Sequence, residues 1–186
     1  MRQVWVRLGA LFGATMVLAL HPSGAAAAEQ NRGGDVARVV QLINAERQSA
    51  GLSALVLSPQ LSEAAQSYSQ VLASGTCFHH TCGGVPNFAD RLGQAGYTGW
   101  SAIAENIAAG YPTPAAVMAG WMASSGHRAN ILSAEYNEIG VGVVSGGRYA
   151  KYWTQEFGRR RGVTLNTPPP APDAIPADPL SSSEEP

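Results

Sequence analysis

The feature that most constrains this chain is a pair of alternating apolar segments near its C-terminal end, "EIGVGVV" (138–144) and "YAKYWTQEF" (149–157). In a β-strand every second side chain points to the same face, so this alternation predicts two strands. The intervening "SGGR" is a typical hairpin turn. Two antiparallel strands are stable only if other elements cover their apolar face. The residues expected on that face are Ile139, Val141 and Val143 in the first strand and Tyr149, Trp153 and Phe157 in the second.

Four helices are predicted upstream and are the candidates for that cover. Asp35 is a suitable N-cap for a helix over 36–50, which Gly51 would end. Ser58 followed by Pro59 predicts a second helix, and Asn87 and Thr113 begin two more. The segment 101–110, "SAIAENIAAG", is ambiguous between a turn and a short helix, and Gly126 is expected to break the last helix before His127. The predicted fold class is therefore α+β, with helices packed on a small antiparallel sheet. The buried stripe of the second helix is expected to contain Leu61, Ala64, Ala65, Tyr68 and Leu72.

The chain divides into four predicted segments. Residues 1–28 have a basic start, an apolar run at 8–20 and the small-residue exit Ala26–Ala28, which is the pattern of a cleaved signal peptide. A linker at 29–34 and a domain at 35–161 follow, and 162–186 is a Pro-, Ser- and acid-rich tail expected to be disordered. We therefore expect a secreted or cell-envelope protein without a stable membrane anchor. The formal net charge of −1 gives no reason to expect nucleic acid as a partner.

The cysteine–histidine segment "GTCFHHTCGG" contains both cysteines of the chain, Cys77 and Cys82. In an exported protein, two such thiols are expected to form a disulfide. A zinc site built from four ligands within six consecutive residues is disfavoured, because structural zinc sites draw on two separated pairs. The predicted disulfide would stiffen the loop that presents His79 and His80.

Several motifs, taken together and in order, resemble the bacterial branch of the CAP superfamily, also called the SCP or pathogenesis-related-1-like domain or the cysteine-rich secretory protein family. They are "LINAERQSAGLSAL", "FHHT", "DRLGQAGY", "AENIAAGY", "VMAGWMASSGHRANIL", "YNEIGVGVV" and "YWTQEFG". The resemblance implies a three-layer α-β-α sandwich with a cleft that gathers two histidines and acidic residues. The matching positions here are His80, Glu105 and His127, whereas Ser124 stands where many members have a second acid.

The resemblance leaves three functional readings open. The first is a secreted, non-enzymatic module that binds a lipid, a wall component or a partner protein, in which His80, Glu105 and His127 form a site for a divalent metal such as zinc. The second is a hydrolase that uses the same cleft, either metal-assisted or with Ser124 as a nucleophile. The third is a purely structural cluster of hydrogen bonds. The residues expected beside the cleft are His79, Ser124, Ser125 and Arg128.

Overall fold

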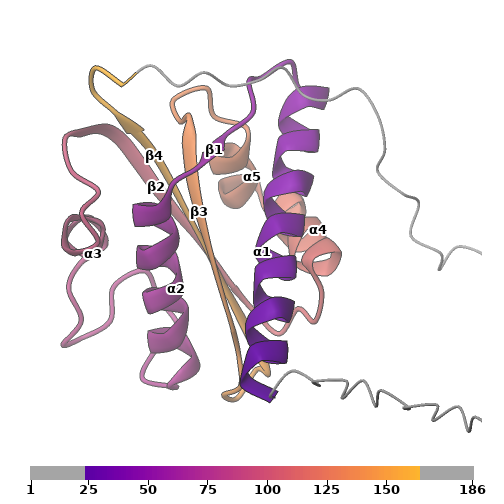
Figure 1. Ribbon diagram of the computed structural model, residues 1–186. Helices are drawn as coiled ribbons and strands as arrows, with labels where there is room; N and C mark the ends of the chain where they lie inside the picture. The colour runs from indigo at the N-terminus through magenta and orange to yellow at the C-terminus, as the bar shows by residue number, and fades with distance from the viewer. Residues whose placement is uncertain (1–23, 164–186) are drawn as a thin grey trace, which may run out of the picture.

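The computed structural model describes residues 24–163, which form one sheet with helices on both faces (Figure 1). The sheet has four strands in the order β1–β3–β4–β2. β3 and β4 form the predicted hairpin, and β2 pairs with the other side of β4, also antiparallel. The two-residue strand β1 pairs with β3 in parallel, so the sheet is mixed where a purely antiparallel sheet was predicted. The strands are β1 (Val56–Leu57), β2 (Trp100–Ala109), β3 (Glu138–Ser145) and β4 (Lys151–Arg160).

The helices form the two outer layers, which confirms the predicted α-β-α sandwich. α1, α4 and α5 pack on one face of the sheet, where Val39, Trp121 and Ile131 share a core with Val141 and Trp153. α2 and α3 pack on the opposite face (Figure 1). The bounds are α1 (Gly24–Ser49), α2 (Pro59–Ala73), α3 (Phe88–Gln94), α4 (Pro114–Ala123) and α5 (Ser125–Ile131).

The predicted helix starts at Ser58, Asn87 and Thr113 are confirmed by their capping hydrogen bonds. The side-chain oxygens of these residues accept from the backbone N–H groups of Leu61, Asp90 and Ala116, respectively, which have no partner within the helix. All five residues of the predicted α2 stripe are buried.

The start of α1 differs from the prediction. The helix begins at Gly24 and continues through residues 29–34, where a linker was expected, so Asp35 lies inside the helix instead of capping it. Asp35 instead accepts a hydrogen bond from Lys151 Nζ, at 2.6 Å. Residues 1–23 and 164–186 lie outside the described part of the chain, so the signal peptide and the disordered tail stay predictions.

Two further expectations about the site region were wrong. Residues 101–110 form neither a turn nor a short helix, because nearly all of this segment belongs to β2. Gly126 does not end a helix before His127, since α4 ends at Ala123 and α5 then carries both Gly126 and His127. β2 was missed because its two faces are both covered, so polar residues on it are buried and the apolar alternation disappears.

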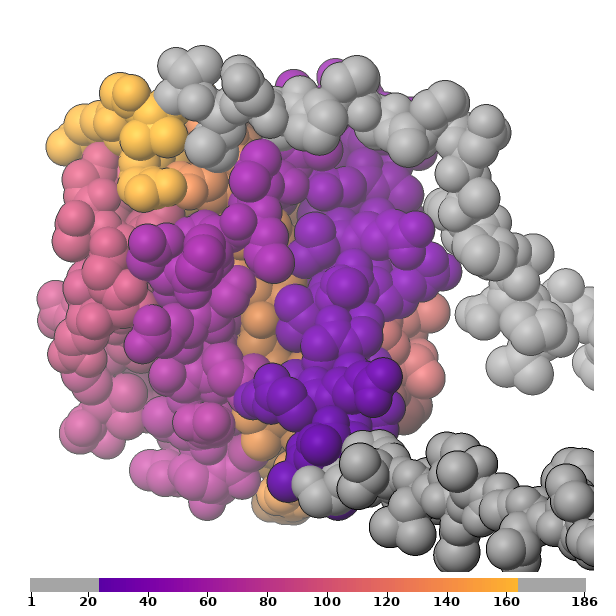
Figure 2. All heavy atoms as spheres, viewed as in Figure 1, coloured from indigo at the N-terminus to yellow at the C-terminus, as the bar shows by residue number. Residues whose placement is uncertain are grey.

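α2 lies directly against β3, and two glycines make this contact possible. A Cβ atom on Gly140 would stand 2.1 Å from the backbone carbon of Leu61, and one on Gly142 would stand 2.2 Å from the carbonyl oxygen of Ala65. Figure 2 shows β3 as a narrow strip between α2 and α1. Within residues 24–163, no helix is long and apolar enough to cross a membrane.

Candidate functional site

The loop that follows α2 is held at both of its ends. A disulfide joins Cys77 to Cys82, which confirms the predicted pairing, and Cys82 is buried. The Tyr68 hydroxyl donates a hydrogen bond to the carbonyl of His79. Arg91 Nη1 donates to the carbonyl of His80 at 3.2 Å. The backbone that presents His79 and His80 is thus fixed from α2 and from α3.

The imidazole of His80 is oriented by a carboxylate from β2. His80 Nδ1 lies 2.8 Å from Glu105 Oε1, with the His80 side chain 55% exposed and the Glu105 side chain 2% exposed. The hydrogen bond to Glu105 raises the pKa of His80 above its ordinary value, although partial burial opposes the shift. With Nδ1 used toward Glu105, the ring keeps Nε2 for a ligand. A carboxylate behind an imidazole is the arrangement that orients histidine ligands in metal sites.

The second oxygen of Glu105 is held by Arg91 of α3. Arg91 Nη2 lies 2.5 Å from Glu105 Oε2, and Arg91 Nη1 also donates to the carbonyl of Pro86 at 3.1 Å. The guanidinium stacks 3.5 Å from the centre of the Tyr68 ring. Both carboxylate oxygens of Glu105 are therefore engaged by side chains of the protein. Asp90, the neighbour of Arg91 in the sequence, bonds Asn87 instead, while Arg91 turns inward.

A second buried carboxyl group lies beside Glu105 and was missed from the sequence. Glu156 of β4 is the register partner of Glu105, and it is fully buried. Burial, followed by the charge of Glu105 and a hydrogen bond to the Glu105 side chain, raises the pKa of Glu156 well above 4.5. The sequence contained a signal for this burial. Glu156 and Phe157 are neighbours that point to opposite faces of β4, and both faces of a central strand are buried in a sandwich that is covered on both sides.

On the opposite face of β2, amide side chains attach α5 to the sheet. Asn106 Nδ2 donates to Gln155 Oε1 at 2.9 Å and to the carbonyl of His127 at 3.1 Å. Asn130 Nδ2 donates to Asn106 Oδ1 at 2.8 Å. His80 thus approaches β2 from the α2 layer and His127 approaches from the α5 layer. Burial, followed by the charge of His80, lowers the pKa of His127.

Of the three predicted metal ligands, His80 and Glu105 bond each other, whereas, among the described residues, His127 is joined to β2 only through its backbone carbonyl. Within residues 24–163, no group of three or more His, Cys, Asp or Glu side chains is spaced to hold a metal ion. Because Glu105 is bonded to His80 and Arg91, it supports His80 from behind. Metal binding by His80, Glu105 and His127 stays a prediction.

The residues predicted beside the cleft have distinct surroundings. His79 and Arg128 are exposed, and Ser125 is the first residue of α5. Ser124 joins α4 to α5 and donates its backbone N–H to the carbonyl of Trp121. In the described part of the chain, no hydrogen bond joins the hydroxyl of Ser124 or Ser125 to His127.

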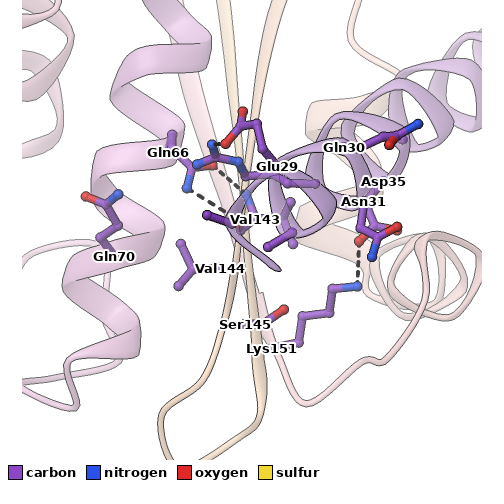
Figure 3. Close-up of a pocket in the computed structure, with 14 residues that line it drawn as sticks. Glu29, Gln30, Asn31, Asp35, Gln66, Gln70, Val143, Val144, Ser145 and Lys151 are labelled. Atoms are coloured by element: carbon purple, nitrogen blue, oxygen red, sulfur yellow. Dashed lines mark hydrogen bonds and ion pairs between the residues drawn. The ribbon is translucent and has the colours of Figure 1, made fainter. Parts of the chain in front are cut away.

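A pocket with a volume of about 940 Å³ lies away from these histidines, between the start of α1, α2 and β3. Figure 3 shows Gln66 pairing with the backbone of Val143 at its wall and Lys151 reaching Asp35. Ala25 and Ala28 also line this pocket, and both belong to the predicted signal peptide. Cleavage there would remove part of its wall, so we place the candidate site at β2.

The fold and the β2 edge define a domain of the CAP type, a mixed sheet covered by five helices within residues 24–163. The sequence profile described as "Cysteine-rich secretory protein family" (CAP) matches residues 40–157. The chain belongs to this family, which confirms the resemblance recognised in the sequence.

Relatives and solved structures agree with this assignment. The chain is 39% identical over 120 residues to the "Uncharacterized protein YkwD" of Bacillus subtilis, covering 64% of this chain and 45% of that protein. The crystal structure of an extracellular protein containing a SCP domain from Bacillus anthracis superposes with a TM-score of 0.68 at 28% identity, covering 76% of this chain and 45% of that one. An outer surface protein of Borrelia burgdorferi shares the fold, with a TM-score of 0.60 at 20% identity over 66% of this chain and 90% of that one. The chain spans less than half the length of the Bacillus relatives.

Proposed function

We propose that this protein is a secreted, non-enzymatic binding module that takes its ligand at the edge of β2, with His80 as the principal contact. The observation that carries the proposal is the arrangement around His80. An exposed imidazole is held from behind by the buried carboxylate of Glu105, which is itself held by the buried guanidinium of Arg91. A side chain that is both exposed and fixed loses little conformational entropy when a ligand binds.

The surroundings of the imidazole favour a ligand that has an apolar part. Phe78 and Tyr149 are large aromatic side chains that remain 38% and 46% exposed. Their ring centres lie 6.3 Å apart, so the disulfide loop and the β3–β4 hairpin together present an aromatic pair next to His79 and His80. Aromatic side chains of this kind provide most of the contact energy at binding surfaces. A lipid or a cell-wall component fits this combination of an aromatic surface and a polar imidazole.

A metal-bound form of this proposal would rest on two imidazoles, because the described residues contain no group of three or more ligand side chains. A zinc ion would be held by Nε2 of His80 and by His127, while Glu105 orients the His80 ring. Zinc bound there would act as a Lewis acid for an oxygen ligand. The secreted location rests on the predicted signal peptide and on the extracellular Bacillus anthracis relative.

A binding role is favoured over hydrolysis because the groups that a hydrolase needs are not connected. A serine nucleophile requires a hydrogen-bonded base, and the hydroxyls of Ser124 and Ser125 make no bond to His127 within the described residues. Glu105 is not a free general base, because both of its oxygens are engaged. Among the described residues, Nε2 of His80 is free but no hydrogen bond joins it to a serine hydroxyl.

The test compares His80→Gln with His79→Gln, an exposed neighbour on the same loop. Protein secreted from its own host is analysed by native mass spectrometry for bound metal and by mass spectrometry of an organic extract for bound lipid. Zinc chloride is then titrated into the stripped protein while the imidazole resonances are followed by NMR. We expect a co-purified ligand or zinc binding that His80→Gln abolishes and His79→Gln retains. Equal behaviour of both variants, or ester or peptide hydrolysis that disappears in His80→Gln, would overturn the proposal.

A further inference from the structure

The sheet has a largely unpaired edge on the side opposite to β2. The strand order β1–β3–β4–β2 places β2 at one edge and the two-residue strand β1 at the other. β1 pairs only with Glu138 and Ile139, so within residues 24–163 no strand covers the rest of β3, residues 140–145, on that side. The backbone N–H and C=O groups of such an edge are able to pair with a further strand.

A side chain of α2 takes the place of the missing strand at one position. The backbone N–H of Val143 donates to Gln66 Oε1 at 3.1 Å, and Gln66 Nε2 donates to the carbonyl of Val143 at 3.2 Å (Figure 3). A primary amide offers one acceptor and one donor side by side, which is what a residue of a neighbouring antiparallel strand offers. Gln66 is half-buried, so rotation of this one side chain uncovers the edge of β3 at Val143.

The next residue on the same edge is already uncovered. The backbone groups of alternate residues in an antiparallel strand point to the same side, so those of Ser145 point the same way as those of Val143. Ser145 is exposed, and it lines the pocket of about 940 Å³ together with Val143 and Gln66. β3 is the floor of this pocket, and α2 and the start of α1 are its walls (Figures 2 and 3). The volume is at the upper end of the range for ligand pockets, about 300–1,000 Å³.

The predicted signal cleavage would widen this groove and keep its floor. Cleavage after Ala28 removes Ala25 and Ala28 from the α1 wall. The groups that would pair with a strand, on Gln66, Val143 and Ser145, all remain. The processed chain therefore presents the β3 edge in a more open groove.

We propose that this groove binds an extended segment of a partner polypeptide, which displaces the side chain of Gln66 and adds to β3 as a further strand. Main-chain hydrogen bonds provide the affinity in this mode of recognition. The charged side chains of the wall are already paired, Arg32 with Glu29 and Lys151 with Asp35, so a neutral, polar peptide is favoured over a charged one. The groove lies at the opposite edge of the sheet from β2, so it does not depend on the function proposed there.

Two other occupants of this edge fit less well. Because β3 lies on the floor of a pocket between two helices, the β3 edges of two copies cannot approach to the strand spacing of about 4.8 Å. The C-terminal segment of this chain, 164–186, is interrupted by prolines, which have no N–H to donate to a strand partner. A single extended segment from another protein has neither obstacle.

The experiment titrates a terminally blocked heptapeptide of alternating threonine and glutamine into the processed, disulfide-bonded protein, followed by NMR of the amide groups. We expect shifts at Val143, at Ser145 and at the side-chain amide of Gln66. Gln66→Ala should tighten binding by roughly tenfold, because the peptide no longer displaces two hydrogen bonds. Gln70→Ala is the matched control, since Gln70 lies on the same helix and lines the same pocket but makes no side-chain hydrogen bond to β3 in the described part of the chain. It should leave the affinity unchanged.

A second probe separates strand addition from other kinds of contact. The same peptide with alternate backbone nitrogens methylated lacks the N–H donors of one edge and should not bind. Ser145→Pro, made in the Gln66→Ala chain, removes a donor from the exposed end of β3 and should weaken binding, with amide dispersion as the check on folding. Absence of shifts at Val143 and Ser145 in Gln66→Ala, equal binding of the methylated peptide, or shifts centred on His80 would overturn the proposal. A dimer that forms through β3 without peptide would assign the edge to a second copy and would also overturn it.

Discussion

Replacing Arg91 with leucine is expected to destabilise the fold strongly, because it leaves the carboxylate of Glu105 buried without its cation. Arg91 is 7% exposed at its side chain and Glu105 is 2% exposed, so solvent cannot compensate for the lost partner. Removing one member of a buried ion pair costs about 3–5 kcal/mol. That is a large part of the roughly 5–15 kcal/mol by which a domain of this kind is stable.

The measurement is urea-induced unfolding of the disulfide-bonded domain at pH 7, followed by tryptophan fluorescence and circular dichroism. Adding Glu105→Gln to Arg91→Leu removes the unpaired charge, so the double variant should recover part of the lost free energy of unfolding. The coupling between the two sites is expected to be about 1–3 kcal/mol. Arg148→Gln, at an exposed position, should change the stability by less than about 0.5 kcal/mol. A loss below about 1 kcal/mol in Arg91→Leu, or strictly additive effects, would refute this explanation.

Three further predictions concern the fold around the site. Because the pKa of Glu156 is raised, the folded state binds a proton more tightly than the unfolded chain, and stability should fall as pH rises above 4.5; Glu156→Gln should remove this fall and raise the urea midpoint at pH 7, and an unchanged pH profile would contradict it. Gly140→Ala places a Cβ atom 2.1 Å from the backbone of α2 and should cost at least about 3 kcal/mol by thermal unfolding, whereas Gly93→Ala in α3 meets nothing within 4 Å and should be tolerated; similar melting temperatures would be inconsistent with this packing. Reducing the disulfide between Cys77 and Cys82 should cost about 2 kcal/mol, and thiols that react with an alkylating agent before reduction would show that the bond does not form.

The helix starts and the hairpin were predictable because each depends on a local signal. Ser58, Asn87 and Thr113 bond backbone groups three residues away, so the sequence alone contains both partners. The hairpin joins two strands that follow each other along the chain, and its turn residues lie between them. Family resemblance added the third layer, which periodicity did not supply.

The buried polar network could not be predicted, because its partners are distant in the sequence. Arg91 and Glu105 are 14 residues apart, and the register between Glu105 and Glu156 exists only once β2 lies beside β4. A charged residue is exposed in most proteins, so the sequence does not indicate that Arg91 is buried, and only the alternation along β4 indicates it for Glu156. The same reasoning explains why β2 itself was missed, since Glu105 and Asn106 interrupt its apolar pattern and both are buried.

The most direct test of the candidate site is an NMR titration of the two histidines against pH, with Glu105→Gln as the comparison. The hydrogen bond to Glu105 predicts a pKa for His80 above 6.5, and burial predicts one for His127 below 6.5. In Glu105→Gln the pKa of His80 should fall, because the carboxylate that favours the charged ring is gone. A His80 ring that titrates below His127, or whose pKa is the same with and without the Glu105 carboxylate, would contradict the proposed orientation of the site.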